Sequence, residues 1–225
     1  MKRLLHFAED GDTSGFFPQL ATRHNRDEYK MYFGTLKPMA PWLREFMEAK
    51  GVECFSCDCQ GRTSYPIGLI SLARYLRRKR IDILHTHLFD PAVVGLAAGF
   101  LARTPLRVLT RHYSDYHTRI NKAWHVRLDQ LTTRLSHTVI AVSEHTRQHM
   151  IEREGAPVNK VVTVHNGIDF DRFKISGPDA RERVRREFGA EDSSLILTVG
   201  RLHPEKGYSH LFRAMANIKN NFDCP

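Results

Sequence analysis

Short apolar runs rich in β-branched residues alternate with longer amphipathic stretches along most of this chain. Such alternation is typical of strands joined by crossover helices, and it predicts an α/β fold with a parallel sheet and helices on both faces. Strands are expected at Arg3–Ala8, Tyr29–Leu36, Val52–Cys57, Ile81–His87, Arg107–Arg111, Thr138–Val142 and Val161–Val164.

The pattern changes after the seventh strand. A polar stretch and a charged helix at Asp179–Phe188 lead to a new strand at Leu195–Val199, a loop, and a helix at Tyr208–Ile218. One strand and one helix cannot bury a core, so we expect a truncated second domain. The predicted divisions are residues 1–175 for the first domain, 176–193 for a linker and 194–225 for the second domain.

The net charge of +9 favours an anionic partner, which could be nucleic acid, an acidic membrane or a phosphorylated small molecule. The basic run Arg77–Arg80 lacks interleaved aromatic residues, so no nucleic-acid partner is predicted. The longest apolar run, Pro91–Ala102, is too short to span a bilayer, and the N-terminal segment does not read as a secretory signal. We expect a cytoplasmic protein, and peripheral contact with the inner membrane face remains an alternative.

Three cysteines, Cys54, Cys57 and Cys59, lie close together, but a fourth nearby ligand is missing. We interpret them as reduced thiols in a strand rather than as a metal site.

His85 and His87 point to one side of their strand and could be combined with His112 as zinc ligands. We interpret them instead as polar side chains that line the carboxyl edge of the sheet, and no metal is expected.

The segment VGRLHPEKG (Val199–Gly207) joins a strand to a helix and is suited to a diphosphate. Gly200 allows a sharp turn, Arg201 can bridge phosphate oxygens, and Lys206 adds a second positive charge. The helix that follows contributes free amides. The alternative is an ordinary basic loop on a basic protein.

This loop resembles the donor-diphosphate loop of retaining family 4 glycosyltransferases, whose GT-B architecture sets two Rossmann-like domains across a cleft. Three further segments match in the same order: IDILHTH, AVSEHTRQHM and VVTVHNGIDFDRF. The resemblance covers essentially the whole chain. It implies a Rossmann-like acceptor-side domain followed by a strand-loop-helix fragment of the donor-binding domain.

The same resemblance implies roles for several residues. Arg201 and Lys206 would neutralise the departing diphosphate in place of a metal ion. His112, just past the fifth strand, would lie near the transferred sugar. Family members often carry paired glycines after the first strand, whereas this chain has Ser14 and Gly15 in that loop. Because of this difference, the resemblance does not define the acceptor pocket.

Three further positions complete the predicted site. Ser143 begins a helix at the carboxyl edge and offers a hydroxyl beside free amides, so it is placed on the acceptor side with Ser14 and Gly15. Asn166 and Gly167 are expected to shape the crossing between domains, although a plain turn is an equal reading.

The implied function is transfer of a sugar from a nucleotide-diphosphate donor to a hydroxyl of a glycan, lipid or small-molecule acceptor, with retention. No cofactor is expected. These 225 residues are expected to be inactive alone, because the base and ribose pocket and a spaced glutamate pair of the family have no counterpart here. The alternatives are a sugar-nucleotide epimerase of similar fold and a non-enzymatic basic binding module.

Overall fold

The computed structural model describes residues 1–10, 15–115, 123–174, 177–192 and 195–221. By its internal contacts the chain divides into two units, Met1–Ile168 and Asp169–Pro225, and each is described by itself. The domain boundary predicted at residue 175 stays a prediction.

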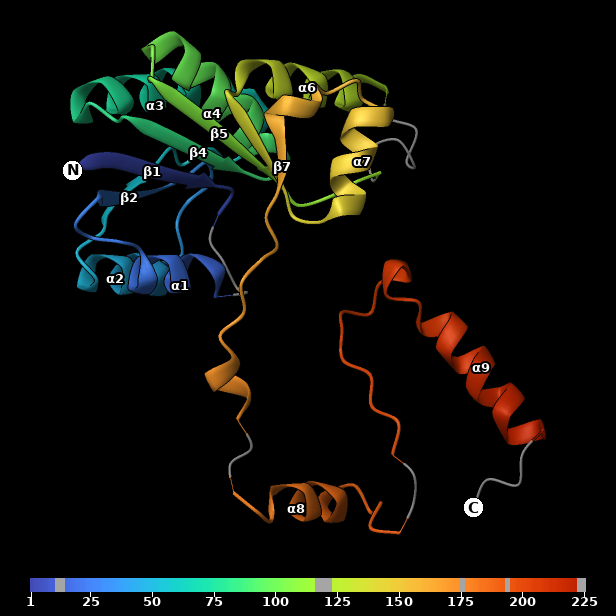
Figure 1. The fold of residues 1–225 in the computed structure, drawn as a ribbon. Coiled ribbons are helices and arrows are strands. Elements are labelled where there is room, and N and C mark those ends of the chain that lie inside the picture. Colours follow the sequence, from blue (N-terminus) through green and yellow to red (C-terminus); the bar gives the residue numbers. More distant parts are fainter. Residues whose placement is uncertain (11–14, 116–122, 175–176, 193–194, 222–225) are drawn as a thin grey trace. The chain divides into compact units, whose positions relative to one another are not determined.

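The first unit is built on a seven-stranded parallel sheet with the order β3-β2-β1-β4-β5-β6-β7 (Figure 1). The strands are β1 (Lys2–Ala8), β2 (Tyr29–Thr35), β3 (Glu53–Ser56), β4 (Ile83–His87), β5 (Leu106–Arg111), β6 (Thr138–Ala141) and β7 (Val161–Thr163). All seven predicted strands are confirmed, and only their ends differ by a residue or two.

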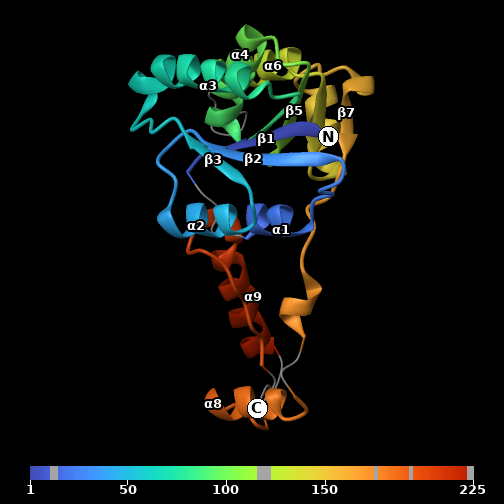
Figure 2. The same ribbon diagram turned by 90° about the vertical axis from the view of Figure 1, so that its left-hand side faces the viewer.

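Helices cover both faces of this sheet, as Figure 2 shows. One face carries α1 (Phe16–Arg23) and α2 (Pro41–Ala49), and the other carries α3 (Tyr65–Lys79), α4 (Phe89–Ala102) and α6 (Ala123–Leu135). A further helix, α7 (Glu144–Glu152), contacts β6 and β7. The predicted α/β class with a Rossmann-like sheet is therefore confirmed.

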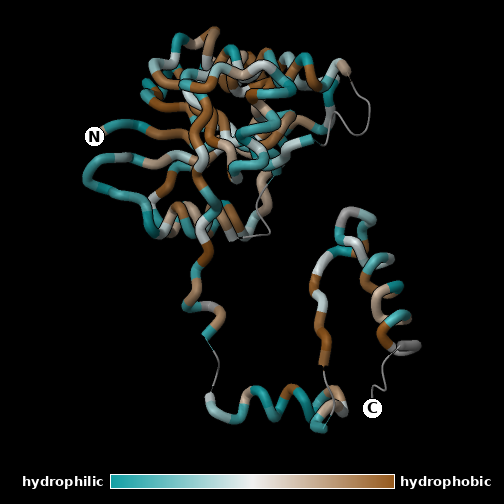
Figure 3. Tube along the Cα trace, turned by 45° about the vertical axis from the view of Figure 1, so that its right-hand side comes forward, coloured by the Kyte–Doolittle hydropathy of each residue, from teal (hydrophilic) through white to brown (hydrophobic). Residues whose placement is uncertain are grey.

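The two faces of β1 bury separate apolar clusters, because successive side chains of a strand point to opposite sides. Leu5 and Phe7 are fully buried with Leu72 on the α3 side, whereas Ala8 packs with Leu43 on the α2 side. Figure 3 shows apolar segments gathered in the middle of this unit. Burial of both faces holds β1 and its neighbours in place.

The second unit contains α8 (Ala180–Glu187) and α9 (Tyr208–Asn221), joined by a segment that includes a short 3-10 turn at Pro204–Lys206. The predicted strand Leu195–Val199 is not found as a strand, and Val199 is 88% exposed. The physical reason is that a strand needs a hydrogen-bonded neighbour, and the described residues offer this segment none.

None of the helices in the described parts of the chain is both long enough and apolar enough to cross a membrane.

The close packing of α4 on the sheet gives a first prediction. A methyl group at Gly95 would lie 2.7 Å from Thr86 Cγ2 and 3.0 Å from Phe7 Cδ1, both in fully buried side chains. Gly95→Ala should therefore lower the free energy of unfolding by about 1–3 kcal/mol in urea titrations, despite the better helix propensity of alanine.

The control is Gly61→Ala, since Gly61 has an extended backbone and open space where the methyl would lie. It should leave stability nearly unchanged. Equal stability of both variants would contradict the close contact described for α4.

Candidate active site

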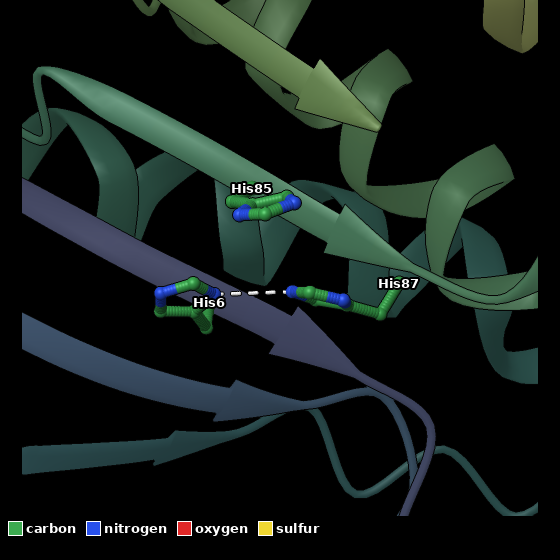
Figure 4. A group of neighbouring side chains, drawn as sticks. All are labelled: His6, His85 and His87. Atoms are coloured by element: carbon green, nitrogen blue, oxygen red, sulfur yellow. Dashed lines mark hydrogen bonds between the residues drawn. The ribbon is translucent and has the colours of Figure 1, made fainter. Parts of the chain in front are cut away.

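Several side chains gather where the strands end at the carboxyl edge of the sheet. Four histidines come close there: His6 on β1, His85 and His87 on β4, and His112 directly after β5. The register pairs His6 with His85, so the side chains of His6, His85 and His87 lie on one face of the sheet (Figure 4). This is the face that α1 covers, since the rings of Phe17 and His87 lie 5.0 Å apart.

Two nitrogen-to-nitrogen contacts connect three of these rings. His6 Nδ1 lies 3.0 Å from His87 Nε2 (Figure 4), and His87 Nδ1 lies 3.4 Å from His112 Nε2. His85 is held differently, with its Nε2 2.7 Å from Thr110 Oγ1. The predicted site residue His112 is therefore joined to the interior of the sheet through His87.

Burial keeps the inner imidazoles uncharged. Desolvation, with a small contribution from His24, lowers the pKa of His6 to about 4. Desolvation and the neighbouring imidazoles also hold the pKa values of His85 and His87 well below the usual 6.5. A neutral imidazole has one N–H donor and one bare acceptor nitrogen, so each ring can pass on one hydrogen bond.

His6, His85 and His87 could be considered as metal ligands, because their nitrogens lie within 4.8 Å of one another. In this structure the nitrogens already have other contacts: His6 Nδ1 and His87 Nε2 lie 3.0 Å apart, and His85 Nε2 lies 2.7 Å from Thr110 Oγ1. We therefore interpret the cluster as hydrogen-bonded side chains; that no metal or cofactor is needed stays a prediction.

The start of α1 closes over the histidines. Gly15 precedes α1 with φ 78°, a left-handed conformation that glycine adopts without strain. The ring of Phe16 lies 6.1 Å from that of His112. Thus the structure brings Gly15 and the start of α1 into the same region as His112, while Ser14 lies outside the described residues.

A buried ionic network anchors the end of β5. Arg111 is 1% exposed, and its Nη1 lies 3.2 Å from both Asp129 Oδ2 and Glu154 Oε1. The Tyr113 hydroxyl donates a 2.6 Å hydrogen bond to Asp129 Oδ1. Two carboxyl groups share one guanidinium, and desolvation raises the pKa of Glu154 to about 7. The network ties the backbone that carries His112 to α6 and to the segment after α7.

Ser143 caps α7, as the sequence indicated for this helix start. Its Oγ accepts a hydrogen bond from the Thr146 backbone N–H at 3.1 Å. A role in binding an acceptor stays a prediction. Asn166 and Gly167 are exposed after β7, and their role between domains also stays a prediction.

The predicted diphosphate loop lies in the second unit. The Tyr208 hydroxyl donates to the Gly200 carbonyl at 2.8 Å, and the Lys206 N–H donates to the His203 carbonyl at 2.9 Å. Arg201 and Lys206 both expose their side chains. The local fold is a compact turn with two accessible cations, and the binding roles of Gly200, Arg201 and Lys206 stay predictions.

Two functional features were missed from sequence. His6 is a polar residue inside the apolar strand RLLHFA, the same kind of signal that drew attention to His85 and His87. Arg111 and Glu154 are 43 residues apart and follow no local pattern, so their pairing could not be read from spacing.

Comparisons with known sequences find a glycosyltransferase family model and relatives named as glycosyltransferases. The family model described as Glycosyltransferase Family 4 matches residues 54–172. The chain is 26% identical over 162 residues to UDP-Gal:alpha-D-GlcNAc-diphosphoundecaprenol alpha-1,3-galactosyltransferase of Escherichia coli, covering 68% of this chain and 40% of that protein. It is 35% identical over 81 residues to GDP-mannose-dependent alpha-(1-6)-phosphatidylinositol monomannoside mannosyltransferase of Mycolicibacterium smegmatis, covering 36% of this chain and 21% of that protein. This chain thus spans less than half the length of these relatives.

Solved structures show the same fold. Anabaena HepE in complex with UDP and glucose superposes with a TM-score of 0.76 at 20% identity, over 96% of this chain and 58% of that chain. UDP-GlcNAc 2-epimerase from Neisseria meningitidis, bound to UDP-GlcNAc, superposes with a TM-score of 0.58 at 16% identity, over 86% of this chain and 56% of that chain. At such identities the likeness concerns the fold alone.

The raised pKa of Glu154 gives a pH-dependent prediction. Between the ordinary value of 4.5 and about 7, the folded protein holds a proton that the unfolded chain has lost. The contribution of this group to stability is therefore full below pH 4.5 and is lost as the pH rises through 7, by at most about 3 kcal/mol. Glu154→Gln should flatten this part of the curve of unfolding free energy against pH, measured by urea titration.

Glu152→Gln removes an exposed carboxylate two residues away and serves as the control, with the wild-type slope expected. If Glu154→Gln kept that slope as well, the buried carboxyl would not hold the proton.

Proposed function

This chain belongs to glycosyltransferase family 4, and from that premise we propose that it forms the acceptor-side half, with the start of the donor-side half, of an enzyme that transfers a sugar from a nucleotide diphosphate to a hydroxyl group. The observation that carries the proposal is the family match across residues 54–172. The carboxyl edge of a parallel sheet, where ligands bind in this fold class, supports it.

In the proposed reaction Arg201 and Lys206 stabilise the negative charge that develops on the departing diphosphate. Gly200 shapes the loop, and its compact turn with two exposed cations supports this role. Because two cations would serve the leaving group, we propose that no metal ion is required. Retention of the anomeric configuration is proposed from the resemblance to retaining members, and the anomeric coupling constant of the product would test it.

His112 is proposed to position the transferred sugar, because it lies at the end of β5 on the carboxyl edge. We propose that Ser14, Gly15 and Ser143 act on the acceptor side. We propose that Asn166 and Gly167 act at the crossing between domains. The names of two relatives contain diphosphoundecaprenol and phosphatidylinositol. They favour a lipid-linked acceptor over a free glycan or small molecule.

A sugar-nucleotide epimerase is the second candidate, since one such enzyme shares the fold. The family match favours the transferase. An assay that separates products would distinguish them, because an epimerase interconverts sugar nucleotides without forming a glycoside. A non-enzymatic basic module would instead bind anionic surfaces with no affinity for a nucleotide sugar.

The diphosphate role predicts the effect of removing one cation. In a version extended with a complete donor-binding domain, Arg201→Ala should lower kcat by about 100- to 1,000-fold, because transition-state charge on the phosphate loses a partner. Release of nucleoside diphosphate, coupled to glycoside formation, measures it. The 225-residue chain is the baseline, and we propose that it transfers no sugar.

Arg213→Ala is the matched control, since it removes the same exposed charge from α9, outside the loop. It should keep nearly full activity, whereas unchanged turnover of Arg201→Ala would refute the assignment of the diphosphate loop.

Peripheral attachment to an anionic membrane, and with it a cytoplasmic location, is proposed as well. Arg74 and Arg78 are exposed on α3, and Ile67 and Ile70 expose apolar area on the same helix. Cosedimentation should show binding to vesicles with anionic lipid and weak binding to zwitterionic vesicles.

Arg74→Glu combined with Arg78→Glu should reduce the affinity for anionic vesicles about tenfold or more, since each charge near the surface contributes about 1 kcal/mol to binding. Equal binding to both vesicles would exclude this contact.

A further inference from the structure

The histidines His6, His87 and His112 form a continuous line of ring nitrogens. His87 stands in the middle, with its Nε2 3.0 Å from His6 Nδ1 and its Nδ1 3.4 Å from His112 Nε2. A neutral imidazole has a single N–H, so His87 cannot donate at both ends or accept at both ends. If it donates to His6, it must accept from His112; if it accepts from His6, it must donate to His112.

The surroundings hold His87 in this arrangement. It is 1% exposed, and the rings of Phe16 and Phe17 lie edge-on to it, 5.8 and 5.0 Å away. On another side the ring of His85 lies 4.2 Å away, and His85 is itself held by the hydroxyl of Thr110. Rotation of His87 would therefore break two hydrogen bonds in a site from which water is largely excluded.

We propose that His6, His87 and His112 act as one hydrogen-bonded chain, in which His87 is the positioning residue that fixes the tautomer and orientation of His112. Nε2 of His112 faces His87 whichever of the two rings donates the hydrogen bond. Its Nδ1, on the other side of the ring, is the nitrogen turned away from His87.

The three hydrogen-bonded histidines determine which nitrogen of His112 carries the proton. When His87 donates to His112, the proton of a neutral His112 lies on Nδ1, which can then donate to an oxygen. When His87 accepts, Nδ1 is bare and can accept from a hydroxyl. That this nitrogen meets the transferred sugar rests on the proposed function, whereas the coupling between the rings does not.

Two substitutions of His87 separate the ends of the chain. The side-chain amide of asparagine reaches the position of Nδ1, and that of glutamine reaches the position of Nε2. His87→Asn therefore keeps a partner for His112, and His87→Gln keeps a partner for His6 and removes the one for His112. Neither change introduces charge.

The test is long-range proton–nitrogen correlation spectroscopy of the ring nitrogens in the 15N-labelled 225-residue chain, with His112→Gln identifying the His112 signals. In the wild type, His112 should show one protonated and one bare nitrogen at a pH where it is uncharged. In His87→Gln, the 15N chemical shifts of the two His112 ring nitrogens should move toward a common averaged value. In His87→Asn, the two shifts should stay as far apart as in the wild type. His85→Gln, which alters a ring outside the chain, should leave the pair separated.

Averaged His112 nitrogen signals in the wild type would overturn the proposal even if the His87 variants failed to fold. Identical His112 signals in the wild type and in folded His87→Gln would also overturn it. The spectra need neither donor nor acceptor. The spectra can therefore contradict the hydrogen-bonded histidines while the transferase proposal stands. Conversely, an activity assay that refuted the transferase proposal would leave the spectra unchanged.

Discussion

The parallel pairing of β1 with β4 is the contact on which the candidate site depends. It joins Leu4 to Ile83 at one end and Phe7 to Thr86 near the other, and it sets His6 opposite His85. The chain leaves β1 into α1 on one face and leaves β4 into α4 on the other face (Figure 2). In sheets of this kind, ligands bind at the carboxyl ends of strands whose following segments leave to opposite faces. A shift of this register by one residue would turn His6 to the other face.

Polar groups near this edge are buried in two different ways. The histidines avoid the cost of buried charge by staying neutral, with each ring satisfying its neighbour. Arg111 keeps its charge and is compensated by Asp129 and Glu154, one of which binds a proton more readily than an exposed carboxyl. Buried ion pairs of this kind add little to the free energy of unfolding, because the cost of removing the charges from water offsets the attraction between them. Their effect is geometric, since both fix the backbone at the ends of β4 and β5.

The sequence predicted what is encoded locally. Each of the seven strands carries its own apolar run, and His85 and His87 were noticed because alternation puts them on one side of one strand. His6 was missed because its partner is set by the pairing of β1 with β4, which no local pattern contains. The predicted strand Leu195–Val199 is not found for the complementary reason. Its composition favours a strand, but a strand needs a second segment to pair with, and no described segment pairs with it.

The two units offer different chemistry, and a sugar nucleotide combines both needs. The sugar is uncharged and is recognised through hydroxyl groups, which suits neutral imidazoles with fixed donors and acceptors. The diphosphate is anionic and gains charge as the bond to the sugar breaks, which suits Arg201 and Lys206. A cationic histidine cluster at the sheet edge would attract phosphates to the position where we propose that the sugar binds. Burial lowers the pKa values of His6, His85 and His87 and keeps this cluster uncharged, which is compatible with the role proposed for the first unit toward the sugar and the acceptor.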